Sequence, residues 1–129
     1  MVSSPRIVIV DDERSVRSGL CNLLQSDGYE TEAFDSAEAF LLDKPAQTQA
    51  ALLILDVKLK GMSGFDLYRQ LVAQAPPPPP VIFISGHGDE NMLWYAISLG
   101  AVTFLRKPIN VDTLLDYIRR ELSAREERR

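Results

Sequence analysis

Short apolar runs and segments with helical apolar spacing alternate along the chain. The runs are rich in Val, Ile and Leu and show no regular polar alternation, a pattern typical of strands buried on both faces of a sheet. The second run is a weaker match than the others. The predicted strands are residues 6–10, 29–34, 51–55, 81–84 and 102–105.

Each run is followed by apolar residues three or four positions apart, which predicts an amphipathic helix. Asp27-Gly28, the prolines at 76–80 and Gly100 are stop signals that end three of these segments. Asp35 and Glu38 have the spacing of a capping box at the start of the short second helix, although Asp replaces the usual Ser or Thr. The predicted helices include residues 16–24, 40–41, 67–72, 90–99 and 111–122.

The order of strand and helix, repeated five times, predicts the fold class. Alternation of this kind gives an α/β fold, a five-stranded parallel sheet with helices on both faces. A length of 129 residues predicts one domain. We place its core at about residues 6–122, and we interpret the charged residues 123–129 as a solvated helix end or the start of a linker.

Composition and charge narrow the class of protein. Hydrophobic residues make up 46% and charged residues 25% of the chain, as in ordinary globular domains, and no apolar run approaches the roughly 20 residues of a membrane span. The net charge of −4 argues against nucleic-acid binding by this segment, which would need a basic face. A single cysteine and a single histidine exclude an internal disulfide and a His-rich zinc site. The start of the chain lacks signal-peptide features, so we expect a cytoplasmic protein with no membrane partner.

Polar side chains follow the ends of four predicted strands. Asp11 and Asp12 follow the first strand, Asp56 the third, Ser85 the fourth and Lys107 the fifth. Because ligands of an open parallel sheet bind beyond the carboxyl ends of its strands, we expect these side chains at one edge. Each residue alone is more often a helix cap, a turn residue or a surface residue. Their coincidence at four strand ends favours a shared chemical role.

Three carboxylates and one ammonium describe a phosphoryl site. Carboxylates this close repel one another unless a cation lies between them, and oxygen ligands with high negative charge suit Mg²⁺. Lys107 adds nothing to a metal site alone, but it can hold a doubly negative group against the metal, and the Ser85 hydroxyl can donate to that group. The set therefore predicts phosphoryl transfer with an aspartate nucleophile.

Four motifs carry a resemblance to a known family. They are IVIVDDE at 7–13, LLILDVKLKGMSGFDL at 52–67, VIFISGHGD at 81–89 and GAVTFLRKP at 100–108. Over residues 6–122 the sequence resembles the receiver domain of bacterial two-component response regulators, whose fold is a flavodoxin-like (βα)5 sheet. The SGHGD and GMSG segments are most similar to receivers fused to helix-turn-helix output domains. The resemblance implies a phosphorelay switch that controls such an output, most often transcriptional, rather than an enzyme with its own substrate.

The resemblance also assigns roles to the residues of the site. It implies that Asp56 is the phosphoacceptor and takes a phosphoryl group from a histidine of a sensor kinase. Asp11, Asp12 and Asp56 would hold Mg²⁺, together with the main-chain carbonyl of Lys58. Lys107 would pair with the phosphoryl oxygens.

A conformational switch follows from the same resemblance. Ser85 would move to hydrogen-bond the phosphoryl group, and Phe104 would be the switch aromatic that turns inward when Ser85 moves. The Lys107-Pro108 peptide is a candidate for a cis bond. We expect phosphorylation to change the face formed by residues 90–99 and 102–105, with homodimers through this face and the last helix as one outcome.

Some positions depart from the family pattern. Lys60 stands where the family often has Pro, which loosens the loop after the phosphoacceptor and adds positive charge near the site. Phe104 lacks the hydroxyl of the commoner Tyr, so its inward state makes no hydroxyl hydrogen bond. Prolines 76–80 are a stiff connector, with docking of a proline-binding domain as the alternative. Trp94 marks a contact surface if it is exposed.

Three other classes of protein fit less well. A phosphatase of the haloacid-dehalogenase type needs a second Asp two residues after its nucleophile, where this chain has Lys58, and a cap domain. A pseudo-receiver, which is a binding module with an inactive site, would have lost an Asp or the Lys. A flavin-binding protein needs a phosphate-cradling loop after the first strand, where Asp11 and Asp12 would repel phosphate.

Overall fold

The computed structural model describes residues 4–74, 77–86 and 90–127. Within them, five parallel strands form one sheet in the order β2-β1-β3-β4-β5, which confirms the predicted α/β fold. The strand order reverses between β1 and β3, and ligands of such sheets bind at this point of reversal. The strands are β1 (Arg6–Val10), β2 (Glu30–Phe34), β3 (Leu52–Asp56), β4 (Val81–Ser85) and β5 (Thr103–Arg106).

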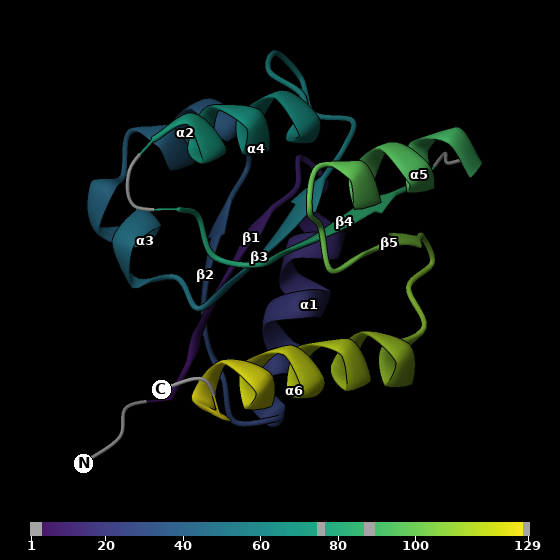
Figure 1. Ribbon diagram of the computed structural model, residues 1–129. Helices are drawn as coiled ribbons and strands as arrows, with labels where there is room; N and C mark the ends of the chain where they lie inside the picture. Colours follow the sequence, from purple (N-terminus) through teal and green to yellow (C-terminus); the bar gives the residue numbers. More distant parts are fainter. Residues whose placement is uncertain (1–3, 75–76, 87–89, 128–129) are drawn as a thin grey trace.

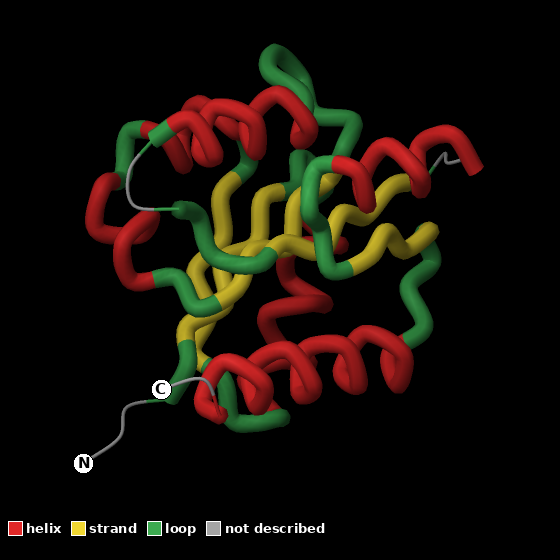
Figure 2. The backbone as a smooth tube through the Cα atoms, in the orientation of Figure 1, coloured by secondary structure: helices red, strands yellow, loops and turns green. Residues whose placement is uncertain are grey.

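Helices cover both faces of the sheet (Figure 1). Figure 2 shows the strands as a layer between α1 and α6 on one side and the other helices on the opposite side. This arrangement confirms the expected helices on both faces. The helices are α1 (Arg14–Ser26), α2 (Ala37–Leu41), α3 (Lys44–Gln49), α4 (Gly64–Ala73), α5 (Glu90–Ser98) and α6 (Val111–Glu127).

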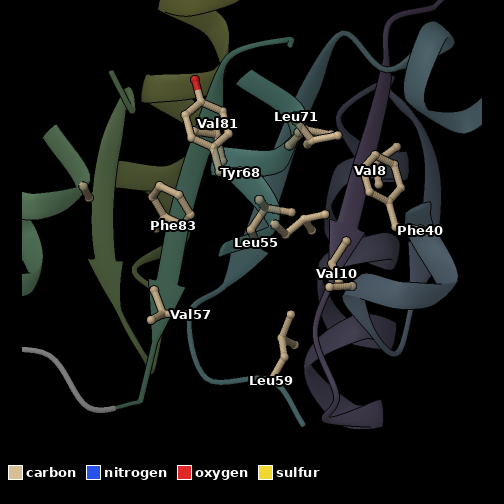
Figure 3. Close-up of a cluster of buried hydrophobic side chains, with 14 of the residues drawn as sticks. Val8, Val10, Phe40, Leu55, Val57, Leu59, Tyr68, Leu71, Val81 and Phe83 are labelled. Atoms are coloured by element: carbon tan, nitrogen blue, oxygen red, sulfur yellow. The ribbon is translucent and has the colours of Figure 1, made fainter. Parts of the chain in front are cut away.

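Successive residues of each strand face opposite layers of helices, which gives the molecule two cores. Ile7 and Ile9 of β1 pack with buried residues of α1 and α6. Val8 and Val10 of the same strand face the other core, where Figure 3 shows them beside Phe40 of α2. Because both faces are covered, the inner strands are continuous apolar runs in the sequence.

The short helix α3 is absent from the pattern-based prediction. Its segment has no apolar spacing, and local polar contacts define it instead. The Asp43 carboxylate accepts a hydrogen bond from the Ala46 N–H at 3.0 Å, and Pro45 stands in the first turn. These are the usual features of a helix start, and they need no apolar stripe.

The capping prediction for α2 is wrong. The N-cap is Ser36, whose Oγ accepts from the Ala39 N–H at 3.1 Å, so the helix begins one residue later than the Asp35–Glu38 pair requires. The Glu38 carboxylate instead accepts a hydrogen bond from the Met62 N–H, in the loop after β3.

The charged residues 123–127 continue α6 and are the end of a helix in the structure. Residue 76 of the proline connector and residues 87–89 of the SGHGD motif lie outside the described residues. Across the part of the chain that is described, no helix combines the length and apolar character needed to cross a bilayer.

Candidate functional site

Two neighbouring strands bring three carboxylates together. β1 and β3 pair with Val10 opposite Leu55, so Asp11 and Asp56 lie side by side at the same end of the sheet. Carboxylate oxygens of Asp11, Asp12 and Asp56 lie within 4.8 Å of one another. Asp11 and Asp56 are buried and Asp12 is partly exposed.

Lys107 reaches these carboxylates from the end of β5. Its backbone N–H donates to the Ser85 carbonyl oxygen at 2.8 Å, which fixes the start of the side chain beside β4. Its ammonium nitrogen lies 2.8 Å from Asp11 Oδ2, 3.0 Å from Glu13 Oε1 and 3.2 Å from Asp56 Oδ2. One ammonium thus faces three carboxylates.

The Asp11 carboxylate has one hydrogen-bonded oxygen and one without a donor. Oδ1 accepts from the Glu13 N–H at 2.8 Å. Oδ2 is close enough to Lys107 for an ion pair, yet the angles are not those of a hydrogen bond, so it has no hydrogen-bond donor among the described residues. A buried charged oxygen in this state is well placed to bind a cation. The three carboxylates therefore fit Mg²⁺, which prefers oxygen ligands.

Burial and neighbouring charges set the ionisation of the site. Burial raises the pKa of the Asp56 carboxyl to about 6, the Asp11 carboxylate adds to the rise, and Lys107 opposes it. Burial disfavours the charged form of Lys107, but its contacts with Asp11 and Glu13 outweigh this and raise the Lys107 pKa above its ordinary value. At neutral pH the site therefore holds an ionised Asp56 beside a permanent cation.

The loop after β3 folds back on Asp56. The Lys58 N–H donates to Asp56 Oδ1 at 3.2 Å, while the Lys58 side chain is exposed. Gly64, the first residue of α4, approaches so closely that a Cβ there would lie 2.2 Å from the Asp56 carbonyl oxygen. Only glycine allows this approach. The metal-binding role of the Lys58 carbonyl stays a prediction.

Glu38 of α2 holds the same loop from the outside. Its Oε2 accepts from the Met62 N–H at 3.0 Å. Gly61, which precedes Met62, has a φ of +79°, in the left-handed region that favours glycine. The exposed Lys60 replaces the proline common in the resembled family, and the loosening expected from this change is opposed by the Glu38 hydrogen bond.

The two predicted switch residues lie on neighbouring strands. Ser85 is buried and is the last residue of β4. The sequence pattern ended this strand at residue 84 and placed Ser85 just after it. Phe104 of β5 pairs in register with Phe83 and is 8% exposed, within the core beneath α4 and α5. Phe104 is therefore buried in this structure. The Lys107-Pro108 peptide bond, which follows β5, is cis.

Three residues of the site are absent from the sequence-based prediction, namely Glu13, Glu38 and Gly64. Glu13 and Gly64 lie inside the IVIVDDE and GMSG segments, so the motifs contained them without indicating what they touch. Glu38 has only the capping spacing, which pointed to a different contact.

Comparison with known proteins agrees with the geometry. The family model for the response regulator receiver domain matches residues 7–119. The chain is 45% identical over 116 residues to the response regulator protein TmoT of Ectopseudomonas mendocina, which covers 90% of this chain and 52% of that protein. It is 36% identical over 114 residues to the transcriptional regulatory protein FixJ of Bradyrhizobium diazoefficiens, which covers 88% of this chain and 55% of that protein.

Solved structures give the same result. The response regulator StyR superposes with a TM-score of 0.83 at 43% identity, covering 98% of this chain and 63% of that one. A CheY-like receiver domain protein from Methanospirillum hungatei gives a TM-score of 0.86 at 26% identity, covering 98% of this chain and 100% of that one. The chain spans about half the length of curated relatives such as TmoT and FixJ. The match of the family model over residues 7–119 shows that the chain belongs to the response regulator receiver domain family.

Proposed function

We propose that this chain is a phosphorylation switch in which Asp56 takes a phosphoryl group from a histidine of a sensor kinase. The observation that carries the proposal is the buried Asp56 carboxylate, which lies 3.2 Å from Lys107 Nζ and within 4.8 Å of the Asp11 and Asp12 carboxylates. Membership of the receiver family supports it, because phosphoacceptance is the activity of that family.

The transfer is an in-line displacement at phosphorus. An Asp56 carboxylate oxygen forms the new O–P bond as the P–N bond of the donor phosphohistidine breaks, and the imidazole nitrogen keeps the electron pair. Lys107 pairs with the phosphoryl oxygens and offsets their charge. The chain's part is to keep Asp56 ionised, buried and aimed at the open edge of the sheet.

We assign Mg²⁺ to the carboxylates of Asp11, Asp12 and Asp56 and to the carbonyl oxygen of Lys58. The buried Asp11 Oδ2, which lacks a hydrogen-bond donor among the described residues, supports this assignment. When bound, the ion supplies positive charge that offsets the repulsion among the carboxylates and the phosphoryl oxygens.

The proposed output is a change on the face formed by α5 and β5. Ser85 moves to donate to the phosphoryl group, and Phe104 repacks with it. On α5 the Trp94 side chain is 66% exposed, and the exposed Ile97 adds to an apolar surface suited to a homodimer or another partner. In this function DNA binding belongs to a separate output domain. The segment itself is cytoplasmic and has no activity beyond its own phosphorylation and dephosphorylation.

The test of the proposal is to map the modified residue. Wild type treated with a small acyl phosphate and Mg²⁺ should gain one phosphoryl group, and Asp56→Ala should gain none. Asp66→Ala is the matched control, because it removes an exposed carboxylate of α4 and should be modified like wild type. A phosphoryl group that persists in Asp56→Ala would overturn the assignment.

A second experiment tests transmission. Beryllofluoride, a phosphoryl mimic, should change the sedimentation of wild type or the amide exchange of α5, and it should do so much less in Ser85→Ala. An identical response in the two proteins would show that Ser85 does not carry the signal.

A further inference from the structure

Glu13 stands at the N-cap of α1 without capping it. N-cap side chains usually accept a hydrogen bond from the first turn of their helix, but the Glu13 side chain makes no such bond. Its backbone is fixed at the site, since its N–H donates to Asp11 Oδ1 at 2.8 Å and its carbonyl accepts from the Arg17 N–H at 3.1 Å. The carboxylate instead extends to Lys107, across 94 positions of the sequence.

Lys107 divides its hydrogen bonds between a buried and an exposed carboxylate. Its ammonium donates to Asp56 Oδ2 at 3.2 Å and to Glu13 Oε1 at 3.0 Å, and it makes an ion contact with Asp11. An ammonium has three N–H donors, and two of them are used here, while Asp11 Oδ2 is held by charge alone. A phosphoryl group on Asp56 adds charged acceptor oxygens that compete with these carboxylates for the one ammonium.

The contact that yields is the one with Glu13. The Glu13 side chain is 59% exposed, so water can replace the ammonium there, whereas the Asp11 and Asp56 side chains are buried. A phosphoryl group also brings about −1.5 to −2 charges to the site, and the Glu13 carboxylate repels that charge as well as competing for Lys107.

We infer that Glu13 is a positioning residue that holds Lys107 in the unphosphorylated chain and competes with the phosphoryl group for it. The inference rests on the proposed function of Asp56. Glu13 thus favours the unphosphorylated state, and its loss shifts the balance toward the phosphorylated one.

The test is the affinity of the intact chain for beryllofluoride at saturating Mg²⁺, measured by calorimetry. Glu13→Gln should bind the mimic about two- to fivefold more tightly than wild type, the range expected for a partly exposed ion pair. Asp35→Asn is the matched control, because it removes one exposed carboxylate after β2, at the same edge of the sheet, and Asp35 forms no ion pair with Lys107 in the described structure.

Thermal unfolding without the mimic separates positioning from a structural role. A structural loss would lower both the midpoint and the affinity, whereas the inferred role predicts higher affinity with an unchanged or slightly lower midpoint. Failure of wild type to bind the mimic would overturn the proposed function itself. If wild type binds the mimic at least as tightly as Glu13→Gln does, the role of Glu13 is overturned and the proposed function stands. The same holds if Asp35→Asn tightens binding as much as Glu13→Gln does.

Discussion

At the scale of single residues, the site depends on a buried carboxyl group whose ionisation is costly. Burial raises the pKa of Asp56 to about 6 from 3.8, so the folded chain holds this proton more tightly than the unfolded chain does. The contribution of the group to stability is therefore greatest below about pH 4 and falls as the pH rises through 6. Above that pH Asp56 is ionised, which is the form that phosphoryl transfer needs and also the form that lowers the stability of the folded chain.

Asp56→Asn should therefore be more stable than wild type at pH 7.5 in a metal chelator, by on the order of 1–3 kcal/mol. The difference should shrink toward pH 4.5, where wild type is protonated. Urea unfolding at the two pH values measures it. Asp66→Asn is a control that should change stability in the opposite direction. Hydrogen bonds from Arg69 and Ser63 lower the pKa of Asp66, so the loss of its charge should lower the stability at pH 7.5. A variant that is less stable than wild type at pH 7.5 would contradict the account of Asp56.

At the scale of elements, α4 links the site to α5. Its first residue, Gly64, packs on the backbone of Asp56. Its next residue, Phe65, stacks edge-to-face on Phe83 of β4 at 4.8 Å and on Tyr95 of α5 at 4.9 Å between ring centroids. Through Tyr95, α5 is thus packed on α4, while Trp94 of the same helix is exposed. A change at the Asp56 strand end can reach α5 through this packing.

Two glycines that look alike in the sequence should respond in opposite ways to alanine. Gly64→Ala should cost about 1–3 kcal/mol or more, because the new Cβ meets the backbone of Asp56 at 2.2 Å and forces the backbone to move. Gly19→Ala should gain about 0.5–1 kcal/mol, because Gly19 lies inside α1 with no atom within 4 Å of the added Cβ. Thermal or urea unfolding of both variants checks the pair. Equal stability of Gly64→Ala and wild type would contradict the close approach of Gly64 to the Asp56 backbone.

At the scale of the whole molecule, the sheet concentrates negative charge at one end. The order β2-β1-β3-β4-β5 puts the ends of β1 and β3 side by side at the point where the order reverses, and three carboxylates meet there. Lys107 contacts two of these carboxylates, those of Asp11 and Asp56, and also the carboxylate of Glu13. A chain of net charge −4 that folds in this way should gain stability from a divalent cation.

Adding Mg²⁺ should raise the thermal midpoint of wild type, with a stabilisation of about 2.7 kcal/mol when the ion is at 100 times its dissociation constant. A chelator should reverse the shift. Asp12→Ala should fold at least as well as wild type without metal, because one source of repulsion is gone, but it should lose most of the Mg²⁺ response. KCl at matched ionic strength controls for screening. An equal Mg²⁺ response in both proteins would reject the metal site.

The sequence by itself determined the five strands, the helices with apolar stripes and the class of chemistry. It did so because burial leaves a periodic apolar pattern in strands and helices, and because parallel strands end at one edge. Asp11, Asp12, Asp56 and Lys107 could therefore be brought together without coordinates.

Only the tertiary structure decided which side chains touch between distant segments. The contact of Glu13 with Lys107, the hydrogen bond from Met62 to Glu38 and the approach of Gly64 to Asp56 leave no periodic signal. Each depends on the course of a loop and the reach of one side chain, which are set by packing across the whole domain rather than by local pattern. For the same reason α3, which is defined by polar contacts at a loop, emerged only from the fold.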